Sequence, residues 1–178
     1  DWIDSSGVWS IVGTKLHQND EANSNTNIYT ALDQNNSDKF LYHYKANISG
    51  SGITKRAGFH YMCDDGAQTN RGNSYFVWFR QDDGAIQFFK VINNVFTMEK
   101  NVTYAFNSAQ EYDYKIVYDK ITGITEVYVD DVFIDSWQDA APITAGDYVS
   151  FRSGNAIYDV DDLRVYHNRT LSETILVG

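Results

Sequence analysis

The sequence has little cysteine, proline or positive charge. Its 178 residues include one Cys and one Pro, and 14 Lys and Arg stand against 24 Asp and Glu. Cys63 has no partner for a disulfide within the chain, so stability must come from packing, backbone pairing or a bound ion. The formal net charge of -10 argues against nucleic acid as a partner, because that affinity comes mostly from basic side chains that neutralise phosphates.

Long apolar runs are also missing. No stretch approaches the roughly 20 apolar residues that a membrane helix needs, and no segment resembles a charged and apolar leader. We therefore expect no membrane partner. The chain has the length of one domain, residues 1–178, and is large enough to bury roughly two-thirds of the surface that its unfolded form would expose.

Aromatic residues, in contrast, are plentiful, with 13 Tyr and 10 Phe. Aromatic side chains favour strands, while the abundant Asn, Asp and Gly favour turns. Strand signals bounded by such turn residues recur about every ten residues. They are KFLYHYKANISG, RAGFHYMCD, NSYFVWFRQ, AIQFFKVI, YDYKIVYD, TEVYVDD, VFIDSW, DYVSFRSG and YDVDDLRVYH. The sequence therefore predicts nine or more strands.

The turns between these segments indicate how the strands pair. The segment AIQFFKVI follows NSYFVWFRQ across QDDGA, in which Asp83 and Gly84 suit the left-handed conformations of a tight hairpin. Helical periodicity is nearly absent, and only LSETILVG at residues 171–178 has the pattern of a helical turn. We therefore predict an all-β fold in which two antiparallel sheets form a sandwich, a jelly roll, rather than a propeller or a solenoid.

One predicted strand has bulky side chains on both faces. In SYFVWFR, residues 75, 77 and 79 point one way and residues 76, 78 and 80 the other. One face must enter the core, so the other leaves aromatic rings on an outer surface. These rings either form a binding surface or lie beneath a third layer or long loops, and the sequence leaves both alternatives open.

The order of the segments resembles that of the concanavalin A-like lectin/glucanase superfamily, and within it the laminin-G-like jelly-roll modules. The similar segments are SGVWSIVGTKLHQND, AGFHYMCDDGAQTNRGNSYFVWFRQDDGAIQFFKV, YDYKIVYDKITGITEVYVDDVFIDSW and VDDLRVYHNRTLSETI. The last of these resembles the final strand of the family and its Asn-Arg-x-Leu-Ser tail. The resemblance covers nearly the whole chain and implies the jelly-roll fold. The superfamily contains lectins, carbohydrate-binding modules, glycosidases, lyases and protein-binding modules, so the fold alone does not give the function.

The sequence lacks the full set of catalytic residues of the glycosidases, and it lacks the sequence motifs in which the lyases carry theirs. Retaining glycosidases need two carboxylates about 5 Å apart, which the superfamily's glucanases supply from a Glu-x-Asp-x-x-Glu strand that this chain lacks. In YDVDD, Asp159 and Asp161 share a face but have no Glu partner. Lyases of the superfamily use a cationic residue with a His and a Tyr, and the chain has these residue types without the sequence context of the lyase motifs. We therefore expect a non-catalytic module.

Carbohydrate binding suits the residues that remain. Sugars stack their C–H faces on aromatic rings, and their hydroxyls take bidentate hydrogen bonds from Arg, Asn and Asp. We predict a ligand-binding surface on one sheet, with two residues near its rim and Tyr61 as the substitute if the register differs by one residue. The surface residues are His60, Trp78, Arg80 and Arg152, and the rim residues are Arg56 and Tyr75.

The acidic residues of the closing strand suggest a metal site. Modules of the resembled group often hold a structural calcium where the first and last strands meet, and calcium prefers about six to eight oxygen ligands. Asp161 and Asp162 are the candidate ligands, with Asp1 or Asp4 as their partner if the N-terminal strand pairs with the last one. The alternative is a solvated cluster, or one that is paired with Arg164.

Together these observations predict a non-catalytic carbohydrate-binding module that targets a larger secreted protein to a polysaccharide or oligosaccharide. The alternatives are a glycoside hydrolase or polysaccharide lyase of the same fold, or a protein-binding adhesion module. We expect a monomer that is covalently linked to other domains of a longer chain. We also expect a secreted or cell-surface location in a bacterium, because this blend of aromatic, Asn and Asp residues is common in extracellular bacterial modules that handle polysaccharides.

Overall fold

Alternating buried and exposed residues form the long strand β5 (Lys39–Ser49). Its Phe40, Tyr42 and Tyr44 are buried, while the residues between them lie on the other face and are partly exposed. This period of two is what a strand with one face in the core requires. The computed structural model describes residues 1–168, and its regular elements over this range are fourteen strands.

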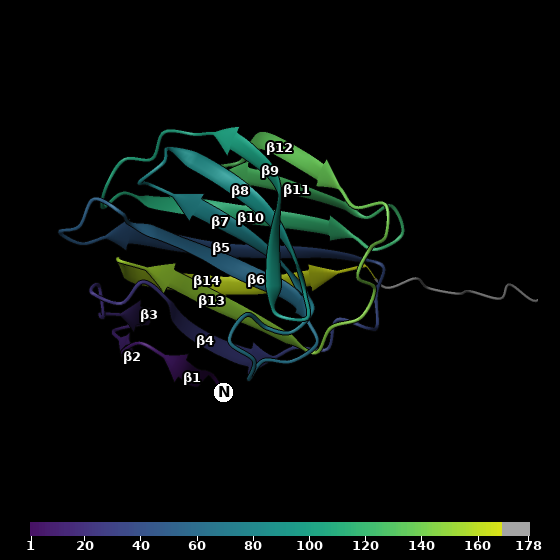
Figure 1. Cartoon of the computed structure of the whole chain (residues 1–178), viewed down its shortest axis with the longest axis horizontal. Coiled ribbons are helices and arrows are strands. Elements are labelled where there is room, and N and C mark those ends of the chain that lie inside the picture. Colours follow the sequence, from purple (N-terminus) through teal and green to yellow (C-terminus); the bar gives the residue numbers. More distant parts are fainter. Residues whose placement is uncertain (169–178) are drawn as a thin grey trace, which may run out of the picture.

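The strands form two antiparallel sheets of seven. Sheet A contains, in spatial order, β1 (Ile3–Ser6), β4 (Thr26–Ala31), β13 (Tyr148–Gly154), β6 (Arg56–Cys63), β7 (Ser74–Arg80), β8 (Ala85–Ile92) and β9 (Val95–Thr103). Sheet B contains β12 (Val132–Gln138), β11 (Ile124–Val129), β10 (Glu111–Asp119), β5, β14 (Ile157–His167), β3 (Lys15–Gln18) and β2 (Trp9–Val12). Figure 1 shows the sheets lying one over the other, with β9 and β12 at one edge of the sandwich and β1 and β2 at the opposite edge.

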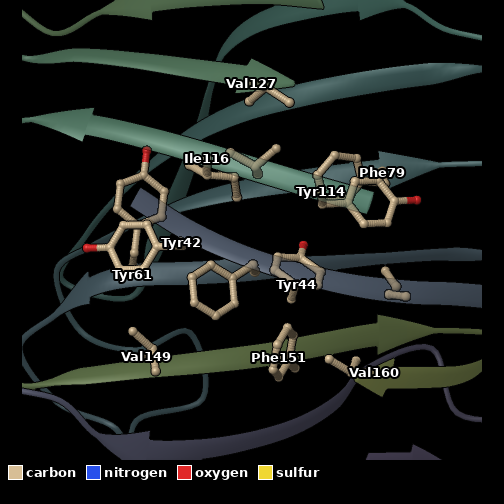
Figure 2. Close-up of a cluster of buried hydrophobic side chains, with 14 of the residues drawn as sticks. Tyr42, Tyr44, Tyr61, Phe79, Tyr114, Ile116, Val127, Val149, Phe151 and Val160 are labelled. Atoms are coloured by element: carbon tan, nitrogen blue, oxygen red, sulfur yellow. The ribbon is translucent and has the colours of Figure 1, made fainter. Parts of the chain in front are cut away.

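Aromatic rings fill the space between the sheets. Tyr42 and Tyr44 of sheet B contact Phe59 of sheet A, with ring centroids 5.4 and 5.5 Å apart, and Phe59 in turn lies 5.0 Å from Phe151. Figure 2 shows side chains from both sheets meeting in this layer. Pairs of this kind contribute about 0.5–1.5 kcal/mol each beyond their burial. The abundance of Tyr and Phe in the sequence is therefore largely a property of the core.

Tight turns with left-handed residues connect neighbouring strands. Asp130 and Asp131, between β11 and β12, have φ of 51° and 64°, as a two-residue hairpin requires. Asn93 and Asn94 form an equivalent turn, with φ of 51° and 65°, between β8 and β9. Gly84, with φ of 59°, ends the predicted QDDGA turn between β7 and β8. These turns place β7, β8 and β9 side by side.

The predicted all-β sandwich is confirmed, and every one of the nine predicted segments contains a strand. The strand signals missed β1, β4 and β9, whereas β2 and β3 lie in SGVWSIVGTKLHQND, the first of the segments that resemble the family. The helical turn expected at residues 171–178 lies outside the described residues. None of the described elements is a helix long and apolar enough to cross a membrane.

Candidate functional site

The structure decides which face of β7 enters the core. Tyr75, Val77 and Phe79 lie between the sheets, so Phe76, Trp78 and Arg80 point to the outer face of sheet A. The same alternation on β6 and β13 places their polar residues on this outer face as well. Figure 1 shows β13, β6 and β7 side by side in sheet A. Basic and aromatic side chains from these three adjacent strands therefore lie on one surface.

Cross-strand pairing sets Trp78 at the centre of this surface. Gly58 of β6 lies opposite both Arg152 of β13 and Trp78 of β7, and Gln87 of β8 continues the row. A Cβ atom at Gly58 would lie only 2.7 Å from ring atoms of Phe76. The glycine thus leaves the space that the ring of Phe76 occupies beside β6.

Three guanidinium groups surround the indole ring of Trp78. The Cζ atoms of Arg56, Arg80 and Arg152 lie 5.3, 5.6 and 5.7 Å from the ring centroid. At such distances cation–π attraction holds each guanidinium near the ring. Trp78 is partly exposed, but its Nε1–H is buried and has no hydrogen-bond partner among the described residues. We call Arg56, Trp78, Arg80 and Arg152 the Trp78 cluster.

Arg80 is the member of the Trp78 cluster whose charge is balanced. Its Nε and Nη2 donate to the two carboxylate oxygens of Asp82, at 2.9 and 2.6 Å, and Nη2 lies 2.8 Å from Asp83. Burial alone would raise the pKa of the Asp82 carboxyl, but the hydrogen bonds and charge of Arg80 bring it below its usual value. The same hydrogen bonds raise the pKa of Arg80. This bidentate pair fixes Arg80 at the edge of the cluster.

Arg152, in contrast, has no carboxylate partner within residues 1–168. Only 8% of its surface is exposed, and its Nη1 donates to the Oδ1 of Asn70 at 2.9 Å. Its Nε–H is buried without an acceptor, and among the residues that the structure describes no Asp or Glu forms an ion pair with it. Burial, followed by the charges of Arg71 and Arg56, lowers the pKa of Arg152 to about 10. The guanidinium remains charged at neutral pH and is not neutralised.

His60 lies on the same face but beneath it. Its ring stacks on Phe76 with centroids 4.2 Å apart, Phe96 lies 5.7 Å away, and none of its surface is exposed. Nδ1 lies 3.2 Å from the Ser74 hydroxyl, while Nε2 has no partner among the described residues. Burial, with the charges of Arg152 and Arg71, holds the pKa of His60 well below its usual range, so the ring is neutral. His60 therefore supports the surface from below.

Arg71, which the sequence analysis missed, anchors the loop of residues 64–73. It is fully buried, and its Nε donates to the Ser150 hydroxyl, Nη1 to the Gly66 carbonyl and Nη2 to the Ser5 hydroxyl, each at 2.8 Å. Its φ of 68° is an unusual conformation that the sequence does not signal. Phe96 of β9 lies against His60 and Phe76, with ring centroids 5.7 Å from each, so a neighbouring strand covers these two rings.

Two further aromatic residues of the outer face of sheet A were not among the predicted site residues. Phe89 and Phe96 are partly exposed, and their rings lie 5.6 Å apart beside Trp78. Phe96 stands on β9, and the Asn93-Asn94 turn between two apolar pairs was the signal for that strand. The partners that position the arginines, Asn70 and Asp82, come from loops and carry no periodic signal.

Tyr75 does not belong to this surface, and the expectation that it lies near the rim is wrong. It is buried in the core, and its hydroxyl donates to Asp139 at 2.7 Å. Lys90 neutralises that carboxylate from 2.6 Å. Tyr61 also points into the core, where its hydroxyl lies 2.6 Å from that of Thr125, so the alternative register is wrong too. The predicted residues that the structure brings together are Arg56, Trp78, Arg80 and Arg152.

The acidic residues of β14 lie far from this face, on sheet B. A bulge at Asp162, with φ of 55°, turns its carboxylate toward Lys45 at 3.3 Å and Arg164 at 3.6 Å. The Thr14 hydroxyl donates to Asp161 at 3.4 Å. Pairing with Arg164 is the alternative that the sequence left open, and the geometry of Asp162 agrees with it.

Asp1 precedes β1 of sheet A, whereas Asp161 and Asp162 lie on β14 of sheet B. The N-terminal strand β1 pairs with β4 rather than with β14, so the assumed pairing of the first and last strands is wrong. Within residues 1–168 no group of three or more His, Cys, Asp or Glu side chains is arranged to hold a metal ion. Calcium binding by Asp161 and Asp162 stays a prediction, and equal melting curves in calcium and in chelator would exclude it.

Comparison with known proteins gives likeness of structure and not of sequence. No family model matches the chain, and no curated protein matches it. The carbohydrate-binding module CBM66 from Bacillus subtilis superposes with a TM-score of 0.76 over 92% of this chain and 94% of its own, at 14% identity. The Bacillus licheniformis beta-glucanase superposes with a TM-score of 0.63 over 94% of this chain and 92% of its own, also at 14% identity.

The Caenorhabditis elegans galectin LEC-6 matches with a TM-score of 0.62 over 78% of this chain and 89% of its own, at 14% identity. The fold is the β-sandwich that these three proteins share. The resemblance seen in the sequence is thereby confirmed at the level of the fold. At these identities the likeness does not transfer binding residues, so the site must be argued from the Trp78 cluster itself.

Proposed function

We propose that this domain binds carbohydrate on the outer face of sheet A, at the Trp78 cluster. The observation that carries the proposal is the set of buried donors without acceptors around a partly exposed indole, the Nε1–H of Trp78 and the Nε–H of Arg152. Buried polar groups normally have hydrogen-bond partners, and a sugar offers both hydroxyl acceptors and a C–H face for the ring. Structural neighbours named as a carbohydrate-binding module and a galectin support the class of ligand.

The cluster is also prepared for a ligand before one arrives. Asp82 fixes Arg80, and Asn70, from the loop that Arg71 anchors, holds Arg152. Side chains that are already ordered lose little conformational entropy when a ligand binds. This preorganisation suits a non-catalytic binding site.

The experiment is a glycan array followed by calorimetry on each hit. The wild type is expected to bind at least one glycan, and Trp78→Ala to weaken that binding roughly tenfold or more because the stacking surface is lost. Phe133→Ala is the matched control, since Phe133 is 52% exposed but lies on β12 of sheet B. Binding to no glycan, or equal losses in both variants, would refute the proposal.

The proposal extends to a targeting role in a larger secreted protein. A domain whose site lies on one open sheet face can bind a polysaccharide while its chain ends connect to other domains. Incubating the domain with a bound polysaccharide tests the enzymatic alternative, and new reducing ends or unsaturated products would favour it. Capture of a protein partner that sugar does not displace would favour the adhesion alternative.

A further inference from the structure

We propose that the glycan carries an anionic group, a carboxylate of the uronic acid kind, and that Arg152 together with Arg56 binds it. This inference rests on the proposed function and names the ligand class of the same face. It begins from a contrast in charge, because a chain of net charge -10 gathers three arginines around one indole ring. In the described part of the chain, the ion pairs of these arginines go to Asp82 and Asp83 alone.

The two acids are taken up by Arg80, which leaves the other arginines with free donors. Asp82 is within hydrogen-bond distance of Arg80, whereas its carboxylate lies 3.6 Å from the Nη1 of Arg56. Arg56 otherwise donates only from Nη1 to the Thr54 carbonyl at 3.1 Å among the described residues. Arg152 has a single acceptor among the described residues, the neutral amide of Asn70. The positive charge of Arg152 is therefore unpaired there, and Arg56, which shares Asp82 with Arg80, keeps hydrogen-bond donors for a ligand.

Arg152 is buried, so the lack of an acidic partner among the described residues suggests that a ligand supplies one. A charged group that is more than nine-tenths buried is costly unless a charge of opposite sign or a full set of hydrogen bonds accompanies it. Contacts with the rings of Trp78 and Phe96, at 5.7 and 5.0 Å, recover part of this cost but supply no acceptor for Nε–H. A ligand anion supplies both the charge and the acceptor.

Register places the two arginines where one anion can reach both. Arg56 lies opposite Gly154 and Arg152 opposite Gly58, so the residues are diagonal neighbours on β6 and β13. Diagonal positions on one face are about 7–8 Å apart at the backbone, within reach of long side chains. A planar guanidinium binds a carboxylate through two parallel hydrogen bonds, while the face of Trp78 remains for the adjoining sugar ring.

The first part of the test separates charge from glycan shape. The domain is titrated with polygalacturonate and alginate, with the carboxyl-reduced form of each, with chondroitin sulfate and its desulfated form, and with neutral xylan and mannan. The proposal predicts binding of at least one uronate polymer, a loss of about tenfold or more on carboxyl reduction, and weaker binding at high salt. Preference for chondroitin sulfate that disappears on desulfation would overturn the carboxylate in favour of sulfate.

The second part assigns the preference to the named residue. Arg152→Gln removes the charge and is expected to abolish the preference for the acidic form while the variant still folds. Arg164→Gln makes the same change on β14 of sheet B, where the side chain is 59% exposed, and is expected to leave the preference intact. An acidic preference that survives in a folded Arg152→Gln variant would overturn the assignment.

The outcomes for the two proposals are distinguishable. Equal binding of the acidic and the carboxyl-reduced polymers, or binding of xylan or mannan alone, would overturn the acidic ligand and leave carbohydrate binding intact. If none of these polymers bound and the glycan array was also empty, both proposals would fall.

Discussion

Individual side chains on the outer face of sheet A differ in how far their hydrogen bonds are satisfied. Arg71 and Arg80 use most of their donors within the protein, whereas Arg152 and Trp78 each keep a buried N–H that has no acceptor in the described part of the chain. A satisfied arginine stabilises the scaffold, and an unsatisfied one leaves an interaction for a ligand to make. Residue types alone do not show this difference, because all three arginines look alike in the sequence.

His60 should make the protein less stable in mild acid. Its pKa is lowered in the folded state by burial and by Arg152 and Arg71, whereas in the unfolded chain it is near 6.5. The unfolded state therefore takes up a proton below about pH 6.5 that the folded state does not, and stability falls as the pH falls. We expect denaturant unfolding to show about 1 kcal/mol less stability at pH 5.5 than at pH 7.5, relative to the same difference in His60→Gln. Identical pH dependence in the two proteins would contradict this account.

Two core tyrosines should respond in opposite ways to loss of the hydroxyl. Figure 2 shows Tyr61 and Tyr114 in the core. The hydroxyl of Tyr61 is hydrogen-bonded to Thr125 at 2.6 Å, whereas that of Tyr114 is buried without a partner in the described residues. Tyr61→Phe leaves a buried threonine hydroxyl unpaired and should cost about 1–3 kcal/mol of unfolding free energy, while Tyr114→Phe should be neutral or stabilising. Urea unfolding of both variants measures the difference, and a larger loss for Tyr114→Phe would argue against it.

At the scale of single elements, the sequence was a good guide to strands and a poor one to their faces. Alternation was enough to predict β5, and Asp-Gly was enough to predict the hairpin after β7. The orientation of β7 was open because residues 75–80 are bulky on both faces, and burial on both faces removes the alternation signal. The loop partners of the arginines come from long-range contacts, which local patterns do not report.

Strand β6 needs glycine at position 58, because there is no room there for a Cβ atom. A Cβ atom there would lie 2.7 Å from the ring of Phe76 and would also clash with the carbonyl of Val77. Gly58→Ala should therefore lower the unfolding free energy by about 1–3 kcal/mol, although alanine normally favours regular structure over glycine. Thermal melting would measure it, with Gly13→Ala as a contrast because a Cβ atom there meets no neighbour within 4 Å and its φ of 64° gives backbone strain alone. An unchanged melting temperature in Gly58→Ala would contradict the packing described here.

At the scale of the molecule, the two sheets have different tasks. Sheet B closes the aromatic core, while the outer face of sheet A gathers charge and aromatic rings through the pairing of β13, β6 and β7. If the outer face of sheet A binds an anionic glycan as proposed, its arginines should attract that ligand electrostatically, and added salt should weaken the attraction. The fold could be inferred from the order of the segments. Which side chains share the outer face of sheet A could not, because that depends on the register in which the strands pair.

The most direct test of the account is the location of the bound glycan. In a two-dimensional ¹H–¹⁵N NMR titration with an oligosaccharide of whichever polymer binds, we expect the largest shifts at the indole Nε1–H of Trp78, the Nε–H of Arg152 and the amides of β6, β7 and β13. Shifts confined to sheet B, or to the loops at the ends of the sandwich, would contradict the claim that the outer face of sheet A is the binding site.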